Sequence, residues 1–327
     1  MALSLGLLLT ACGDSASGPV VGQDYEIAFQ NLDAIPSDQG TMVVWVVAGQ
    51  DTLEVATLPA GSGPIGPVTF TNPAEDAREV LVTVEPPSDV SEGPWNSVLL
   101  RGDFGGGGAE LVTQGVVHSS LPLQENPGAH SLFTTSNNSE GYPSAENAGL
   151  WLFTLIPSDN VHGTREVRLT PLTPGWTYEG WIVWQGDPEV WISYGKYRPD
   201  EAGLLSSRDD SGTGPFGGTE DFRNAGVEDV PGEEWTSDEI ALQLGIELPG
   251  GFDLPLALDS VDATGKVMWH HAISIEPAFD LVEGPLEGKP FVVRPYENEI
   301  GAGGPGVPRV IRMAHDPPTA SVRPVSR

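Results

Sequence analysis

The chain has little cysteine, little lysine and no long apolar run. Cys12 is the only cysteine among 327 residues, which excludes an intrachain disulfide, a cysteine-based zinc site and an iron–sulfur cluster. Asp plus Glu number 46 against 15 Lys plus Arg, and the resulting net charge of -31 repels phosphate backbones. Nucleic-acid binding is therefore not expected. After the N-terminus, no window contains the roughly 18 consecutive apolar residues that a transmembrane helix needs.

The first residues resemble the signal of a bacterial lipoprotein. They are apolar from Leu3 to Leu9 and end in small residues before Cys12, which in such signals becomes the acylated N-terminus. We predict a signal peptide at residues 1–11, a polar tether at residues 12–24 and lipid attachment at Cys12. The signal lacks a positively charged start, which an upstream start codon would explain. The alternative is a buried cysteine near an ordinary N-terminus. The lipid would place the protein outside the cytoplasm, on the outer membrane or the periplasmic face.

The remaining composition is that of a loop-rich β protein. Glycine and proline number 41 and 30, more than a fifth of the chain, and no segment shows a sustained helical period. Short runs rich in β-branched residues, such as Met42 to Val47, are typical of buried strands. The sequence therefore predicts an all-β fold.

One segment of eleven residues, which we call the repeated phrase, occurs twice in the chain. Residues 85–95 and 276–286 are identical at six of eleven positions without a gap. Residues 41–47 match residues 177–183 upstream of it, and residues 98–101 match residues 291–294 downstream. We therefore expect two tandem antiparallel β-sandwich (Ig-like) domains of similar topology.

The repeat sets the expected domain boundaries. The first sandwich covers residues 25–103, and the second covers residues 148–296 with an acidic insertion at residues 197–235. The connecting segment 104–147 either completes the first sandwich or bridges the two domains. The basic tail 297–327 either folds back onto the acidic body or stays free.

Two features of the second copy resemble a known family. A strand carrying Tyr178 and Trp181 follows the turn Thr173-Pro174-Gly175, and a later strand ends in Glu276-Pro277 before a Gly/Pro turn. In these features the chain resembles the extracytoplasmic domain of the anti-sigma-K factor family, over roughly residues 25–103 and 148–296. The first copy departs from the pattern, with Met42 where the family has tyrosine. The resemblance implies a β-sandwich with a sensing or binding role and no known chemistry. The family's cytoplasmic helical domain and membrane span have no counterpart here, so transcriptional regulation is not carried over.

Paired acids recur in the two copies of the phrase. Asp89 and Glu92 in the first copy match Asp280 and Glu283 in the second. Such pairs could serve as general acid and base or as calcium ligands. Because their spacing is retained through the repeat, turn geometry is the favoured interpretation.

The acidic insertion contains a weak calcium candidate. Asp209 and Asp210 lie in a glycine-containing stretch, but the alternating ligands and terminal Glu of an EF-hand loop are absent. A solvated acidic loop is the simpler interpretation, so no cofactor is expected and Ca²⁺ is the one candidate. The histidines are scattered except for the adjacent pair His270 and His271, and no nucleophile or phosphate-loop motif is present. We therefore expect a protein that is not an enzyme.

Aromatic residues gather in the second domain. Trp184, Trp191 and Tyr194 are candidate ligand-binding residues, because sugar C–H faces stack on aromatic rings while carboxylates accept bonds from sugar hydroxyls. Core packing is the alternative fate of these rings. The expected function is a lipid-anchored binding or sensing module of the cell envelope, with an unknown envelope protein or glycan as partner. A carbohydrate-binding or adhesion lipoprotein is the alternative, and a hydrolase is the third candidate.

Overall fold

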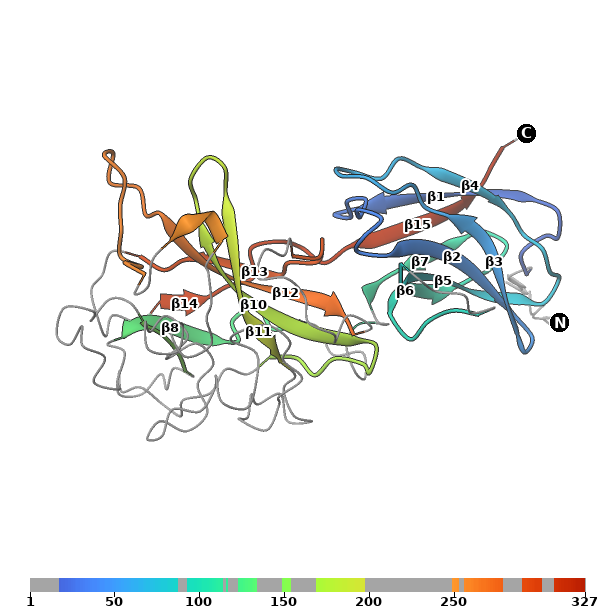
Figure 1. Ribbon diagram of the computed structural model, residues 1–327. Coiled ribbons are helices and arrows are strands. Elements are labelled where there is room, and N and C mark those ends of the chain that lie inside the picture. Colours follow the sequence, from blue (N-terminus) through green and yellow to red (C-terminus); the bar gives the residue numbers. More distant parts are fainter. Residues whose placement is uncertain are drawn as a thin grey trace, which may run out of the picture.

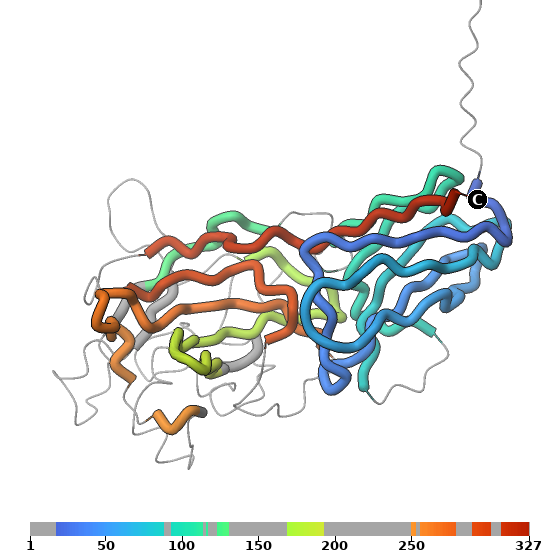
Figure 2. Tube along the Cα trace, turned by 90° about the horizontal axis from the view of Figure 1, so that it is seen from above, coloured from blue at the N-terminus to red at the C-terminus, as the bar shows by residue number. Residues whose placement is uncertain are grey.

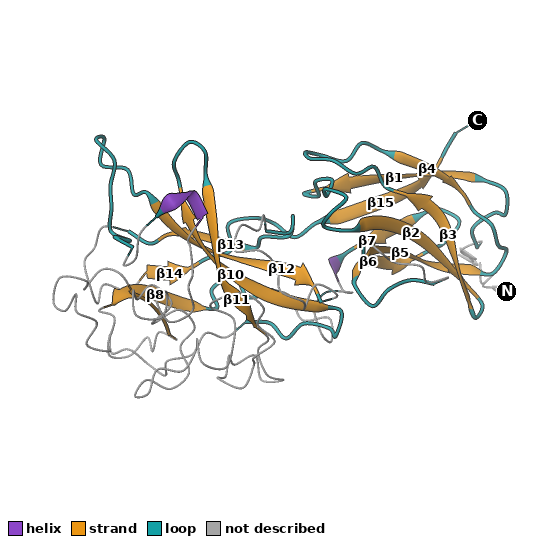
Figure 3. Ribbon diagram, in the orientation of Figure 1, coloured by secondary structure: helices purple, strands orange, loops and turns teal. Residues whose placement is uncertain are grey.

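The computed structural model shows an all-β chain arranged as two lobes (Figure 1). It describes residues 18–87, 93–113, 116, 123–133, 149–153, 169–197, 249–252, 256–278, 290–301 and 309–326. Strands make up nearly all of its regular structure, as Figure 3 shows, with the short 3-10 turn η3 at Pro249–Gly251. Within these ranges there is no helix long and apolar enough to cross a membrane. The prediction of an all-β protein with antiparallel sheets is confirmed.

Lobe 1 consists of two four-stranded sheets. The first has the order β3 (Asp51–Thr57), β2 (Thr41–Ala48), β5 (Ala77–Glu85), β6 (Val98–Asp103). The second has the order β4 (Val68–Thr71), β1 (Asp24–Gln30), β15 (Thr319–Pro324), β7 (Ala109–Leu111). Alternate side chains of β1, such as Tyr25 and Ile27, are fully buried, and they belong to the same apolar cluster as Val44 and Val82 of the first sheet.

Lobe 2 has one four-stranded and one three-stranded sheet. The larger has the order β11 (Val190–Tyr197), β10 (Trp176–Trp184), β12 (Trp269–Pro277), β13 (Tyr296–Glu299). The smaller has the order β14 (Arg309–Ile311), β8 (Gly128–Phe133), β9 (Gly149–Phe153). β2 and β10, the strands that form hairpins with β3 and β11, are each buried along almost their whole length. This burial explains why their sequences are mostly apolar.

The sheets that contain β2 and β10 match in order and in detail. In each, an edge strand pairs with the long apolar strand through a hairpin, and the register shifts at the same place, just before Trp45 and just before Trp181. Residues 41 and 85 are paired in one sheet, and residues 177 and 276 are paired in the other. Positions that the repeated phrase predicts to correspond therefore occupy the same places.

The same buried hydrogen-bond chain occurs in both sheets. In lobe 1 the Trp45 indole N–H donates to the Thr83 hydroxyl over 2.7 Å, and that hydroxyl donates to the Glu85 carboxylate. Glu85 also accepts from the backbone N–H of Trp95 at 3.1 Å. These residues form a lock, in which a nearly buried carboxylate links β2, β5 and the segment before β6.

Lobe 2 repeats the lock with Ser274 in the place of threonine. The Trp181 indole N–H donates to the Ser274 hydroxyl over 2.8 Å, that hydroxyl donates to Glu276, and Glu276 accepts from the backbone N–H of Phe291 at 2.8 Å. The backbone N–H groups of Trp95 and Phe291 are therefore equivalent donors in the two locks. The predicted match of residues 98–101 with 291–294 is displaced by three residues, because Trp95 is the counterpart of Phe291.

The C-terminal segment is part of both lobes. Residues 297–327, which the sequence set apart as a basic tail, contain β14 in lobe 2 and β15 in lobe 1. β15 lies between β1 and β7 and pairs with both. Figure 2 shows this red segment running from lobe 2 along the blue β1 strand. Of the two expected alternatives, the structure shows the tail folded back.

The connecting segment is divided in the same way. β7, near its beginning, completes a sheet of lobe 1, and β8, further along, belongs to lobe 2. β7 ends at Leu111, and residues 256–258 form no strand.

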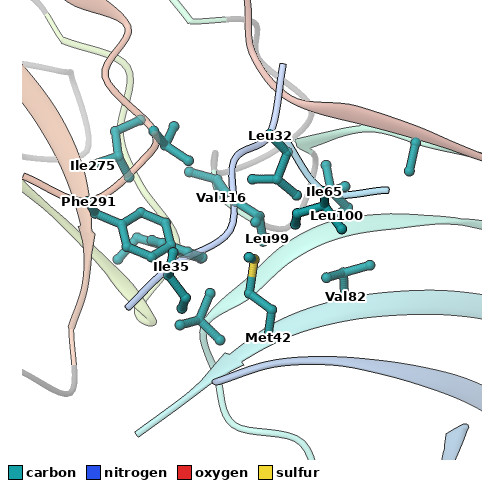
Figure 4. Close-up of a cluster of buried hydrophobic side chains, with 14 of the residues drawn as sticks. Leu32, Ile35, Met42, Ile65, Val82, Leu99, Leu100, Val116, Ile275 and Phe291 are labelled. Carbon is teal, nitrogen blue, oxygen red and sulfur yellow. The ribbon is translucent and has the colours of Figure 1, made fainter. Parts of the chain in front are cut away.

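The lobes share one continuous apolar core. Figure 4 shows Ile35, Met42 and Leu99 of lobe 1 beside Phe291 and Ile275 of lobe 2. Polar contacts cross the same boundary. The Trp176 indole N–H donates to the Val98 carbonyl over 3.1 Å, and the Ser97 hydroxyl donates to the Gly175 carbonyl over 3.0 Å. A Cβ atom on Gly175 would lie only 2.1 Å from the Asn96 carbonyl oxygen, so glycine is required for this close approach.

Candidate functional site

A pocket of about 310 Å³ lies at the junction of the two lobes. We call it the interlobe pocket. Lobe 1 contributes Asn31 and Asp33, and lobe 2 contributes residues 292–295 together with the crossing segment 314–318 and Leu123. Its volume is at the lower end of the range of small-molecule sites, and pockets between domains are common binding sites.

The lobe 1 wall is the loop that follows β1. Asn31 has a left-handed backbone conformation with φ 55°, which turns the chain away from the strand. The loop is then held by a neighbouring turn, since the N–H of Ala34 donates to the Gly63 carbonyl over 2.8 Å and the N–H of Gly61 donates to the Ile35 carbonyl over 2.9 Å. Asn31 and Asp33 therefore present exposed side chains from a fixed backbone.

The lobe 2 wall is held by the buried residues Pro295 and Tyr296. The Pro295 carbonyl accepts from the N–H of Ala314 at 2.8 Å, which fixes the crossing segment next to β13. The Tyr296 hydroxyl donates to the Gln124 carbonyl over 2.8 Å, beside Leu123 of the pocket floor. Burial raises the pKa of Tyr296 above its usual value, so this hydroxyl stays a donor at physiological pH.

The charged groups around the pocket differ in whether they have partners. Arg294 lies with its guanidinium carbon 5.3 Å from the centre of the Trp191 ring, a cation–π contact. His315 is 3.4 Å from the Glu297 carboxylate. In the described part of the chain, no hydrogen bond or ion pair engages the side chain of Asp33 or Asp316. The groups left available are therefore acidic.

The structure places the predicted aromatic candidates Trp184 and Trp191 in different environments. Trp184 packs edge-on against Trp269 and Phe252, with ring centroids 5.0 and 5.4 Å away, and so belongs to the core of lobe 2. Trp191 is half-buried, meets Trp181 edge-on at 5.9 Å and donates its indole N–H to Glu189 over 2.6 Å. Trp191 thus lies beside an acid, with Arg294 over its ring.

Several predicted residues lie outside the described part of the chain. The lipid-attachment residue, the calcium candidates and the paired acids of the repeated phrase are in this group: Cys12, Asp209, Asp210, Asp89, Glu92, Asp280 and Glu283. The side chain of Tyr194 is also outside it. Among the residues that are described, no three His, Cys, Asp or Glu side chains are grouped so that they could hold a metal ion.

A pair of buried histidines joins the two sheets of lobe 2. His130 on β8 and His271 on β12 are almost fully buried, with their Nδ1 atoms 3.4 Å apart and the Nε2 of His130 3.2 Å from the Glu299 carbonyl. Burial lowers the pKa of His130 to about 4 and that of His271 well below its usual value. Both rings are therefore neutral at physiological pH, and sequence reasoning missed the pair because the two residues are 141 positions apart.

This pair predicts a pH dependence of stability. The unfolded chain takes up protons on these histidines below a pH of about 6.5, whereas the folded chain resists protonation, so stability is present above that pH and is lost as the pH falls toward 4. His130 alone should contribute a loss of about 3 kcal/mol. Urea unfolding at several pH values checks this. A His130→Gln/His271→Gln variant should show a flatter dependence between pH 6.5 and 4, and an unchanged slope would contradict the assignment.

Comparison of the chain with protein-family models, with curated proteins and with solved structures found no match.

Proposed function

We propose that the chain is a non-enzymatic, lipid-anchored protein of the cell envelope that binds or senses a ligand in the interlobe pocket. The observation that carries this proposal is the pocket itself, with walls from both lobes that are each fixed by backbone hydrogen bonds. The lipoprotein pattern at Cys12 supports the anchor and the extracytoplasmic location. No nucleic acid is expected as a partner, because the net charge of the chain is -31.

We also propose that the lobes are a tandem repeat of one β-sandwich of Ig-like topology, related to the outer domains of anti-sigma-K factors. The matching sheet orders and the two Trp–Thr/Ser–Glu locks support the repeat. The resemblance to that family rests on the sequence features around Trp181 and Glu276. A repeat of this kind explains why a pocket forms where the copies meet, since neither copy alone contains both walls.

The buried carboxylates support a non-enzymatic role. Glu85 and Glu276 are both nearly buried, but each is engaged as an acceptor of a hydroxyl and a backbone N–H. A carboxylate held in this way acts as a structural acceptor. A single Asp or Glu substitution that abolished turnover of a substrate would overturn this part of the proposal.

A carbohydrate-binding or adhesion role is the second candidate. It is favoured by Trp191, which is half-buried at the surface next to Glu189. Its open ring area is reduced by Arg294, and Trp184 packs in the core, so of the two candidate rings that the structure describes only Trp191 is left for sugar stacking. This site and the interlobe pocket are distinguished by the next experiment.

The test is a thermal-shift screen with glycans, divalent cations and organic amines on the unchanged chain and three variants. Ala314→Trp places a large ring at the pocket, whereas Ala263→Trp makes the same change at an exposed turn that does not line it. We expect a ligand-induced rise in melting temperature that Ala314→Trp loses and Ala263→Trp keeps. A shift that survives Ala314→Trp but is lost in Trp191→Ala would move the site to the aromatic surface.

The membrane anchor is tested separately by lipid labelling in a bacterial host. The complete chain should incorporate labelled fatty acid and partition with membranes, and Cys12→Ser should lose both properties. Equal labelling of the two proteins would contradict anchoring at Cys12.

A further inference from the structure

The charge of the interlobe pocket points to the kind of ligand it takes. Asp33 stands on the lobe 1 wall and Asp316 on the crossing segment, and both are exposed. Within the described ranges, no basic group or hydrogen-bond donor engages either carboxylate. The exposed Asn31 amide next to Asp33 adds a further acceptor.

The basic groups of the same lining are engaged with other groups. The Arg294 guanidinium is paired with the Trp191 ring, and His315 is paired with Glu297. Glu297 also lies 3.6 Å from His270, and the pKa of Glu297 is lowered by His270 first and by His315. This carboxylate therefore contacts both histidines. A cation–π contact leaves the charge of Arg294 in place, so the described lining carries the two aspartates against this one arginine, within a chain of net charge -31.

Part of the pocket lining, which we call the floor, is apolar. Leu123, Val293 and Pro318 are buried residues that line it, and Pro317 and Val292 are half-buried beside them. A methylene stem gains contact with such a floor while a charged head stays at the rim, as the long basic side chains do on protein surfaces. With a volume of about 310 Å³, the pocket has room for a small molecule or one long side chain.

We propose that the interlobe pocket binds an organic cation, an amine or guanidinium group on an apolar stem, with Asp33 and Asp316 as its counter-charges. This proposal rests on the proposed function, since it names the ligand class of the same site. The cation has two possible sources, a free amine or a basic side chain of a partner peptide, and both offer the same chemistry to the pocket.

The test must separate a site from general attraction to an acidic protein. Agmatine serves as the free probe, and its binding is measured by calorimetry on the folded full-length chain. The pocket variant Asp33→Asn/Asp316→Asn is compared with a control of equal net charge, Asp38→Asn/Asp51→Asn, whose aspartates are exposed and do not line the pocket. Loss of two charge-assisted contacts should weaken binding at least about tenfold in the pocket variant and less than about twofold in the control.

A second probe identifies the source of the cation. A tripeptide with one central arginine and blocked ends is measured beside agmatine, and tighter binding of the peptide indicates a side chain, whereas tighter binding of agmatine indicates a free amine. Equal weakening in the pocket variant and the control would overturn the proposal, because it would show attraction to net charge alone. A neutral ligand that loses binding in Ala314→Trp but not in Asp33→Asn/Asp316→Asn would also overturn it, while leaving the proposed function standing.

Discussion

Deletion of residues 319–327 should unfold lobe 1 while the rest of the chain keeps its strands. β15 supplies six residue pairs to β1 and three to β7, and it places the buried side chains of Ala320 and Val322 in the core. Without it, the backbone groups of two strands lose their partners, and the apolar interior of lobe 1 opens to water. Hydrogen exchange checks this, with loss of protection expected across β1 and β7.

Two controls accompany this deletion. Removal of residues 326 and 327 alone leaves β15 intact and should change nothing. A synthetic peptide of residues 309–327 added to the truncated chain should restore protection in β1, because the open place between β1 and β7 accepts the same strand. Undiminished protection of β1 in the truncated chain would show that lobe 1 folds without its C-terminal strand.

Removing the carboxylate of either lock should markedly destabilise its sheet. Glu276→Ala leaves the Ser274 hydroxyl and the Phe291 N–H without this buried acceptor, which should lower the free energy of unfolding by about 3 kcal/mol. Glu85→Ala should cost about 2 kcal/mol, less because the Trp95 side chain is 38% exposed and water reaches that end of the lock more easily.

Urea unfolding followed by tryptophan fluorescence measures both effects. Exposed glutamates on nearby strands provide matched controls, and Glu26→Ala and Glu299→Ala should each cost less than about 0.5 kcal/mol. If the Glu85 and Glu276 variants were as stable as these controls, the two locks would not hold the sheets as described.

The repeated lock could be predicted from the sequence, because the two copies align at the residues that form it. The predicted alignment already placed Trp45 opposite Trp181, Thr83 opposite Ser274 and Glu85 opposite Glu276, and these residues join through bonds between neighbouring strands. The apolar run rich in β-branched residues also identified β2 as a buried strand. Such signals depend only on residues close together in the chain or in the repeat.

Neither β15 nor the pocket could be predicted from the sequence, because both depend on contacts between distant parts of the chain. Thr319–Pro324 is short, contains two small residues and ends in proline, so nothing local marks it as an inner strand. Its partner β1 lies at the other end of the chain. The pocket brings Asn31 and Asp33 next to residues 292–295 and 314–318 only because that crossing occurs. No sequence motif links these positions. Whether the carboxylates of Asp33 and Asp316 have a partner depends on the neighbours that the fold places beside them.

Hydrogen exchange of the full-length chain with and without agmatine tests most directly the claim that the ligand site is shared by the two lobes. Slower exchange is expected on both walls at once, at Ala34 in lobe 1 and at Ala314 in the crossing segment. The β10–β11 hairpin near Trp191 should not change. Protection confined to that hairpin, or to one lobe, or absent altogether at saturating agmatine, would contradict a site built between the lobes.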